Sequence, residues 1–201
     1  MASLKHEISC IILAGGENSR IGKDKAFLQC GERTFIEEQV FTLRNIFEEI
    51  IIVTNNRNKF KDMNVKVVTD IVPHSGPLGG LYTGLAVSSN IHCFVIGCDM
   101  PLINLELIKF MRDNITENDI IIPLTSRGKE TLFAIYSINC LETIKQQLEL
   151  KNLKLIDILK YHKVRYVSEK EIIKFDPEEY SFFNVNSPED YEKVLRLWTK
   201  R

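Results

Sequence analysis

The sequence predicts an α/β protein in which a mainly parallel central sheet carries helices on both faces. Short runs of apolar residues, each about the length of a strand, recur along the chain. Their apolar residues are consecutive rather than alternating, which is typical of parallel strands that are buried on both faces. The segments between these runs show the helical spacing of apolar positions that predicts helices with one buried face.

The predicted elements alternate between strand and helix over the first two-thirds of the chain. The expected strands span residues 8–14, 49–54, 65–70, 92–99 and 119–123. Helical spacing is found at residues 34–47 and 105–115, and Gly76, Gly79 and Gly80 lead into an apolar segment that predicts another helix. Because strands alternate with helices, we expect parallel pairing.

The last third of the chain is less regular. Strands are expected at residues 130–137, 163–169 and 181–186, and helices at residues 140–150 and 153–161. A final helix is expected at residues 187–198, where Ser187 is a suitable N-cap and Pro188 suits the first turn. No repeat and no linker-like composition divides the sequence, so we predict a single domain over residues 1–201.

The composition argues against several classes of protein. A formal net charge of -1 gives no general attraction to a nucleic acid backbone, so no nucleic acid partner is expected. No stretch approaches the roughly 20 apolar residues that span a bilayer, so no membrane partner is expected either. The five cysteines are scattered and lack metal-ligand spacing, which is typical of reduced thiols and predicts a cytoplasmic protein.

A glycine-containing loop follows the first expected strand, and we interpret it as a phosphate-binding loop. It opens with Leu13, Ala14, Gly15 and Gly16. Glycines let the backbone approach an anion closely, and Arg20 and Lys25 add positive charge. The spacing fits neither a P-loop nor a dinucleotide-binding fingerprint. The alternative is a structural turn whose basic side chains are solvated.

Polar residues also stand at the ends of other expected strands. Asp70 and Asp99 follow strands directly, and carboxylates beside a phosphate loop are typical of a Mg²⁺ site. The alternative for each is a turn or helix cap. Asn184 and Asn186 lie two apart on an expected strand and would share a face. They suit either a phosphate or amide-like ring, or the turn before the last helix.

Taken together, these residues resemble the molybdenum cofactor guanylyltransferases, within the nucleotidyltransferases that have a Rossmann-like three-layer sandwich. The matching blocks are residues 13–25, Asp70 with residues 76–80, residues 98–102 and residues 183–190. The resemblance implies transfer of GMP from GTP to the terminal phosphate of molybdenum-molybdopterin, with release of pyrophosphate. It also implies Mg²⁺ as cofactor and transient contacts with proteins that deliver or receive the molybdenum cofactor.

The resemblance also implies roles for individual residues. Arg20, Lys25 and Asp99 would be catalytic, with Asp99 on Mg²⁺ and the two basic residues on the triphosphate. Asn184 and Asn186 would lie near the reacting phosphate or the pterin. The nucleotide would contact Leu13, Ala14, Gly15, Gly16, Lys25, Asp70 and Asp99. Cytidylyl transfer to the same pterin, transfer to a sugar phosphate and non-catalytic nucleotide binding remain as alternatives.

Overall fold

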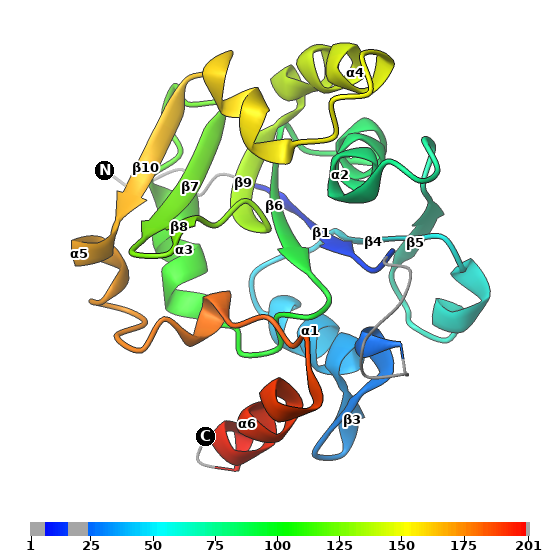
Figure 1. Ribbon diagram of the computed structural model, residues 1–201, viewed down its shortest axis with the longest axis vertical. Helices are drawn as coiled ribbons and strands as arrows, with labels where there is room; N and C mark the ends of the chain where they lie inside the picture. The colour runs from blue at the N-terminus through cyan, green and yellow to red at the C-terminus, as the bar shows by residue number, and fades with distance from the viewer. Residues whose placement is uncertain (1–6, 16–23, 200–201) are drawn as a thin grey trace.

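The computed structural model describes residues 7–15 and 24–199 of the chain, which form a central eight-stranded sheet with flanking helices (Figure 1). The strand order is β10-β7-β9-β6-β1-β4-β5, and β8 pairs with β7. The strands are β1 (Ser9–Leu13), β4 (Ile50–Thr54), β5 (Lys66–Thr69), β6 (His92–Gly97), β7 (Ile120–Thr125), β8 (Gly128–Lys129), β9 (Phe133–Ser137) and β10 (Val164–Ser168). The short strands β2 (Gln29–Cys30) and β3 (Arg33–Thr34) form a separate hairpin.

The prediction of a mainly parallel sheet is confirmed. β1 pairs in parallel with both β4 and β6, so that Ile11 lies between Ile51 and Val95. β5 extends this parallel half on the far side of β4, and β10 is parallel to β7. β9 runs antiparallel to both β6 and β7 and joins the two parallel parts. The carboxyl ends of β1, β4, β5 and β6 therefore meet at one edge of the sheet.

Helices cover both faces of the sheet, as expected (Figure 1). The α-helices are α1 (Phe35–Leu43), α2 (Gly76–Val87), α3 (Leu105–Asp113), α4 (Leu141–Glu149), α5 (Glu169–Ile172) and α6 (Pro188–Trp198). Short 3₁₀ turns are η1 (Lys25–Phe27), η2 (Arg57–Phe60), η3 (Ile138–Cys140), η4 (Leu155–Lys160) and η5 (Tyr180–Phe182). Ile12 of β1 packs in the cluster that includes α1 and α3, whereas Ile11 packs in the cluster that includes α2 and α4.

Capping residues fix the starts of α1 and α6, and a glycine lets α2 pack closely against the sheet. Thr34 caps α1 in a capping box with Glu37, and Ser187 caps α6 in the same way with Asp190. A Cβ atom at Gly84 would lie 2.7 Å from the Ile11 side chain, so glycine at this position lets α2 pack directly against β1.

Two predicted elements are wrong. Residues 153–161 were expected to form an α-helix, but they contain only the 3₁₀ turn η4. Residues 181–186 were expected to form a strand, but the chain makes the turn η5 and then continues in irregular structure. The buried Asp176 carboxylate accepts the backbone amides of Tyr180 and Ser181 and thereby turns the chain. Asn184 and Asn186 consequently do not lie on a strand.

The irregular segment is held in place by α6 and by the end of β6. Val185 and Val194 share a small buried cluster with Phe35 and Leu102, and the Tyr191 ring contacts that of Phe35 at a centroid distance of 5.9 Å. Across the described ranges, no helix combines the length and the apolar character needed to cross a bilayer. The single domain over residues 1–201 stays a prediction.

Candidate active site

Lys25, Asp99 and Asn186 meet at the edge of the sheet where β1 and β6 end. The Lys25 Nζ atom lies 3.4 Å from Asp99 Oδ2 and 2.6 Å from Asn186 Oδ1. The side chains of Lys25 and Asp99 are 20% and 23% exposed, so the pair is half-enclosed yet open to a ligand. The structure therefore brings together three of the predicted site residues, which come from three distant parts of the chain.

The short turn η1 places Lys25 at this edge. The Asp24 side chain caps the turn by accepting the backbone amide of Ala26 at 3.3 Å, and it forms an ion pair with Lys59 at 2.8 Å. Ala26 is fully buried in the core and anchors the turn. An anchored turn directs the Lys25 side chain outward toward Asp99.

The turn after β6 places Asp99. The Cys98 amide donates to the Leu13 carbonyl, and the Met100 amide donates to the Gly97 carbonyl. The Val185 amide donates to the Asp99 carbonyl at 2.9 Å, which ties the C-terminal segment to this turn. A Cβ atom at Gly97 would lie 2.7 Å from Asp99 Oδ1, so a larger residue at position 97 would displace the carboxylate.

A glutamine that the sequence analysis missed also contacts this turn. Gln39 on α1 is fully buried, and its side-chain amide donates to the Gly97 carbonyl at 2.9 Å and to the Met100 carbonyl at 3.0 Å. The signal in the sequence is a polar residue on the otherwise apolar face formed by Phe35, Ile36, Val40 and Leu43.

The thiol of Cys98 lies beside Asp99 in the chain and has a raised pKa. Burial, with the nearby Asp99 and Asp24 carboxylates, raises the pKa of Cys98 well above the ordinary thiol value. A thiolate is the form that acts as nucleophile or metal ligand. The raised pKa favours the neutral thiol of Cys98.

The predicted nucleotide-binding residues are only partly placed. The Ala14 amide donates to the Val53 carbonyl at 2.8 Å, so it is committed to the sheet and cannot also donate to a phosphate. Leu13 accepts from Cys98 through its carbonyl, and Gly15 is exposed beyond it. Gly16 and Arg20 lie outside the described residues, and their roles stay predictions.

Asp70 has a structural role at the end of β5. Its Oδ1 atom accepts the Val72 amide at 3.0 Å and the Thr83 hydroxyl at 2.9 Å, which joins the turn after β5 to α2. These are the contacts of a turn-forming aspartate. Because β5 is the outermost strand on this side, Asp70 is separated from β1 by β4. Its contact with a nucleotide stays a prediction.

The carboxylate at this edge suits a hard cation that takes most of its other ligands from substrate phosphates and water. Within residues 7–15 and 24–199, no group of three or more His, Cys, Asp or Glu side chains forms a cage for a metal ion. Mg²⁺ is commonly held by only one or two carboxylates together with substrate phosphates and water. The partly exposed Asp99 carboxylate fits that mode of binding.

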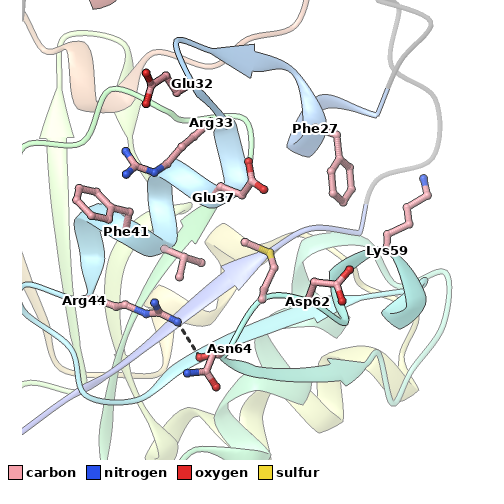
Figure 2. A pocket seen from close by; sticks show the side chains of 11 residues that line it. Phe27, Glu32, Arg33, Glu37, Phe41, Arg44, Lys59, Asp62 and Asn64 are labelled. Atoms are coloured by element: carbon pink, nitrogen blue, oxygen red, sulfur yellow. Dashed lines mark hydrogen bonds between the residues drawn. The ribbon is translucent and has the colours of Figure 1, made fainter.

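A separate pocket of about 460 Å³ lies beside α1 (Figure 2). Arg33, Arg44 and Lys59 line it together with Glu32, Glu37 and Asp62, around the apolar side chains of Phe27, Val40, Phe41 and Met63 and beside Asn64. The Arg44 guanidinium donates to the Asn64 carbonyl at 2.8 Å (Figure 2). The charges of the described lining residues balance, so these residues offer no net positive field to a triphosphate. Among residues 7–15 and 24–199, no predicted site residue lines the pocket.

Comparison with known proteins identifies the family. The model of the MobA-like NTP transferase domain matches residues 10–165. A protein named "Probable molybdenum cofactor guanylyltransferase" from Natranaerobius thermophilus is 42% identical over 199 residues, which cover 96% of this chain and 97% of that relative. A relative of the same name from Pelotomaculum thermopropionicum is 34% identical over 184 residues, which cover 92% of this chain and 90% of that relative.

The fold is also found in a solved structure. Molybdopterin-guanine dinucleotide biosynthesis protein A from Archaeoglobus fulgidus matches with a TM-score of 0.84 at 22% identity, over 96% of this chain and 100% of that chain. At this identity the match shows the shared fold. The matched domain and the two relatives together show that the chain belongs to the MobA-like NTP transferase family, as a nucleotidyltransferase of the molybdenum cofactor guanylyltransferase group.

Proposed function

We propose that this chain transfers GMP from GTP to the terminal phosphate of molybdenum-molybdopterin and releases pyrophosphate. The observation that supports it most directly is the meeting of Lys25, Asp99 and Asn186 at the carboxyl edge of the sheet. The names of the relatives supply the identity of the nucleotide and of the acceptor.

The reaction is a displacement at phosphorus. An oxygen of the acceptor phosphate forms a bond to the α-phosphorus of GTP, and the bond from that phosphorus to the bridging oxygen of pyrophosphate breaks. The acceptor is a phosphate monoester whose second pKa is about 6, so it is mainly dianionic at neutral pH. No general base is required, and the catalyst must instead bring two anions together.

The proposed roles follow from that requirement. The Lys25 ammonium group neutralises the charge of the triphosphate. Asn186 orients the Lys25 side chain through the 2.6 Å hydrogen bond. Arg20, outside the described residues, is proposed for the same triphosphate. Asp99 would hold Mg²⁺, which when bound supplies positive charge to the phosphate oxygens. Asn184 is proposed to lie on the side of the reacting phosphate or pterin.

The test combines nucleotide binding and turnover. Isothermal titration with GTP, CTP, ATP and UTP in Mg²⁺ is expected to show a preference for GTP that Lys25→Ala weakens. Asp99→Ala is expected to lower GMP transfer at least about 100-fold. Lys109→Ala is the matched control because Lys109 also pairs with a carboxylate, that of Glu106 at 2.7 Å, on the exposed surface of α3.

Other outcomes would select another function. Preference for CTP would indicate cytidylyl transfer, and transfer to a sugar phosphate would indicate a different acceptor. Binding without turnover would indicate a nucleotide-binding protein, and normal Mg²⁺-dependent turnover by Asp99→Ala would contradict the role of Asp99.

We also place the reaction in the cytoplasm, with transient contacts to proteins that deliver or receive the cofactor. None of the five cysteines, all of which lie among the described residues, forms a disulfide bond, which suits a reducing compartment.

A further inference from the structure

Gln39 is a polar residue inside an apolar layer. It lies on the face of α1 that packs on the sheet, beside Ile36, Val40 and Leu43, and its side chain is fully buried. The Oε1 atom of Gln39 is buried and has no hydrogen-bond partner among the described residues. An amide with an unpaired oxygen is an unfavourable occupant of such a position, where leucine or methionine would pack without that cost.

The amide nitrogen of Gln39 makes two hydrogen bonds that an apolar side chain could not make. It donates to the carbonyls of Gly97 and Met100, at 2.9 and 3.0 Å, and these two carbonyls bracket Cys98 and Asp99. The Gly97 carbonyl also accepts the Met100 amide, so Gln39 holds the same carbonyl that closes the turn. On the opposite side of the turn, Val185 donates to the Asp99 carbonyl.

We propose that Gln39 is a positioning residue, which holds the turn of residues 97–100 so that the Asp99 carboxylate faces Lys25 in the geometry that transfer requires. This inference rests on the proposed function of Asp99. Without Gln39, the buried Met100 carbonyl loses its donor and the turn is free to move relative to α1. A displacement of about 1 Å at a catalytic group can lower a rate about 100-fold.

The chain offers a matched control for a purely structural role. Gln147 near the end of α4 is also buried, its amide donates to the carbonyls of Asn152 and Lys154 at 3.4 and 3.3 Å, and its Oε1 atom is also buried and without a partner among the described residues. Gln147 therefore makes the same kind of double contact away from the turn of Asp99.

The experiment compares Gln39→Met, Gln39→Leu and Gln147→Met with the unaltered protein. Both replacements at position 39 keep approximately the side-chain volume and remove the donor, so at least one is expected to fold. The measurements are the melting temperature, kcat and KM for GTP over a series of Mg²⁺ concentrations, and hydrogen exchange of the amides of residues 98 and 100.

We expect the Gln39 variants to lower kcat about 10- to 100-fold and to raise the Mg²⁺ concentration for half-maximal rate. KM for GTP should change less than kcat, and exchange at residues 98 and 100 should become faster. Gln147→Met should lower the melting temperature without changing kcat, the Mg²⁺ requirement or this exchange.

The inference is overturned if folded Gln39 variants keep the kcat, the Mg²⁺ requirement and the exchange rates of the unaltered protein. It is also overturned if Gln147→Met lowers kcat equally, because the effect would then come from general destabilisation. Failure of the unaltered protein to transfer GMP would instead contradict the proposed function, and hydrogen exchange would still report whether Gln39 holds the turn.

Discussion

The Nζ atom of Lys25 lies 2.6 Å from the Oδ1 atom of Asn186, although 161 positions separate the two residues. Asn186 is beyond residues 10–165, to which the family model matches. The contact brings the irregular C-terminal segment into the candidate site, which begins after β1. The Val185 amide, which donates to the Asp99 carbonyl, fixes the same segment to the end of β6.

Replacing Asn186 tests whether this contact orients Lys25. Because a hydrogen bond to a charged group contributes about 1.5–3 kcal/mol, Asn186→Ala is expected to lower kcat/KM for GTP roughly 10-fold or more, with a small change in melting temperature since Asn186 is exposed. Asn45→Ala, which changes an exposed asparagine bonded to the Phe41 and Thr42 carbonyls, is the control. Unchanged or tighter GTP binding by Asn186→Ala would show that Asn186 does not position Lys25.

Gly97→Ala tests the space that the Asp99 carboxylate occupies. The added Cβ atom would lie 2.7 Å from Asp99 Oδ1, so the carboxylate must rotate away from its place beside Lys25. We expect a loss of Mg²⁺-dependent turnover of about 10- to 100-fold, measured as kcat against Mg²⁺ concentration. A folded variant with normal turnover would mean that the carboxylate reaches its working position by another rotamer.

The central strands were predictable because most of them are short, continuous apolar runs, and this property is local. Ile50–Thr54 and His92–Gly97 are examples, since their burial on both faces leaves almost no polar position within them. The two-residue strands β2, β3 and β8 contain no such run and were not predicted. The strand expected at residues 181–186 was wrong because a distant contact overrides the local pattern there. The Asp176 carboxylate binds the Tyr180 and Ser181 amides and bends the chain before pairing can begin.

Three residues that meet in the candidate site were singled out from the sequence, but their geometry was not predictable. Glycine and charge at the ends of apolar runs indicated Lys25 and Asp99, whose contact spans 74 positions. The direction of each side chain depends on supports that leave little trace in the sequence. Gln39 is such a support. Asp70 is the opposite case: its position at a strand end suggests a ligand-binding residue, but its Oδ1 atom accepts hydrogen bonds that stabilise a turn.

Gly84→Ala tests the close packing of α2 on β1. Alanine is the better helix former by about 1 kcal/mol, yet its Cβ atom would lie 2.7 Å from the Ile11 side chain. We expect a net destabilisation of about 1–3 kcal/mol, measured by denaturant unfolding. In the double variant Ile11→Ala with Gly84→Ala, the loss of stability should be smaller than the sum of the losses in the two single variants. Strict additivity would show that the loss caused by Gly84→Ala does not arise from its contact with Ile11.

Glu171 is expected to make stability depend on pH in the acid range. The Arg165 guanidinium, 2.6 Å away, together with the hydroxyl and amide of Ser168, lowers the pKa of Glu171 from 4.5 to about 2. Because the folded-state pKa is the lower one, its stabilising effect is fully present above about pH 4.5 and is lost as the pH falls toward 2. Glu171→Gln should therefore lower the melting temperature at pH 7, and the difference in melting temperature from the unaltered protein should narrow below pH 4.5.

Glu169→Gln, at an exposed position on the same short helix, is the control. A gap for Glu171→Gln that stays constant from pH 7 to pH 3 would show that the ion pair with Arg165 does not stabilise the fold, because the contribution of a carboxylate with a lowered pKa has to decline as that carboxylate takes up its proton.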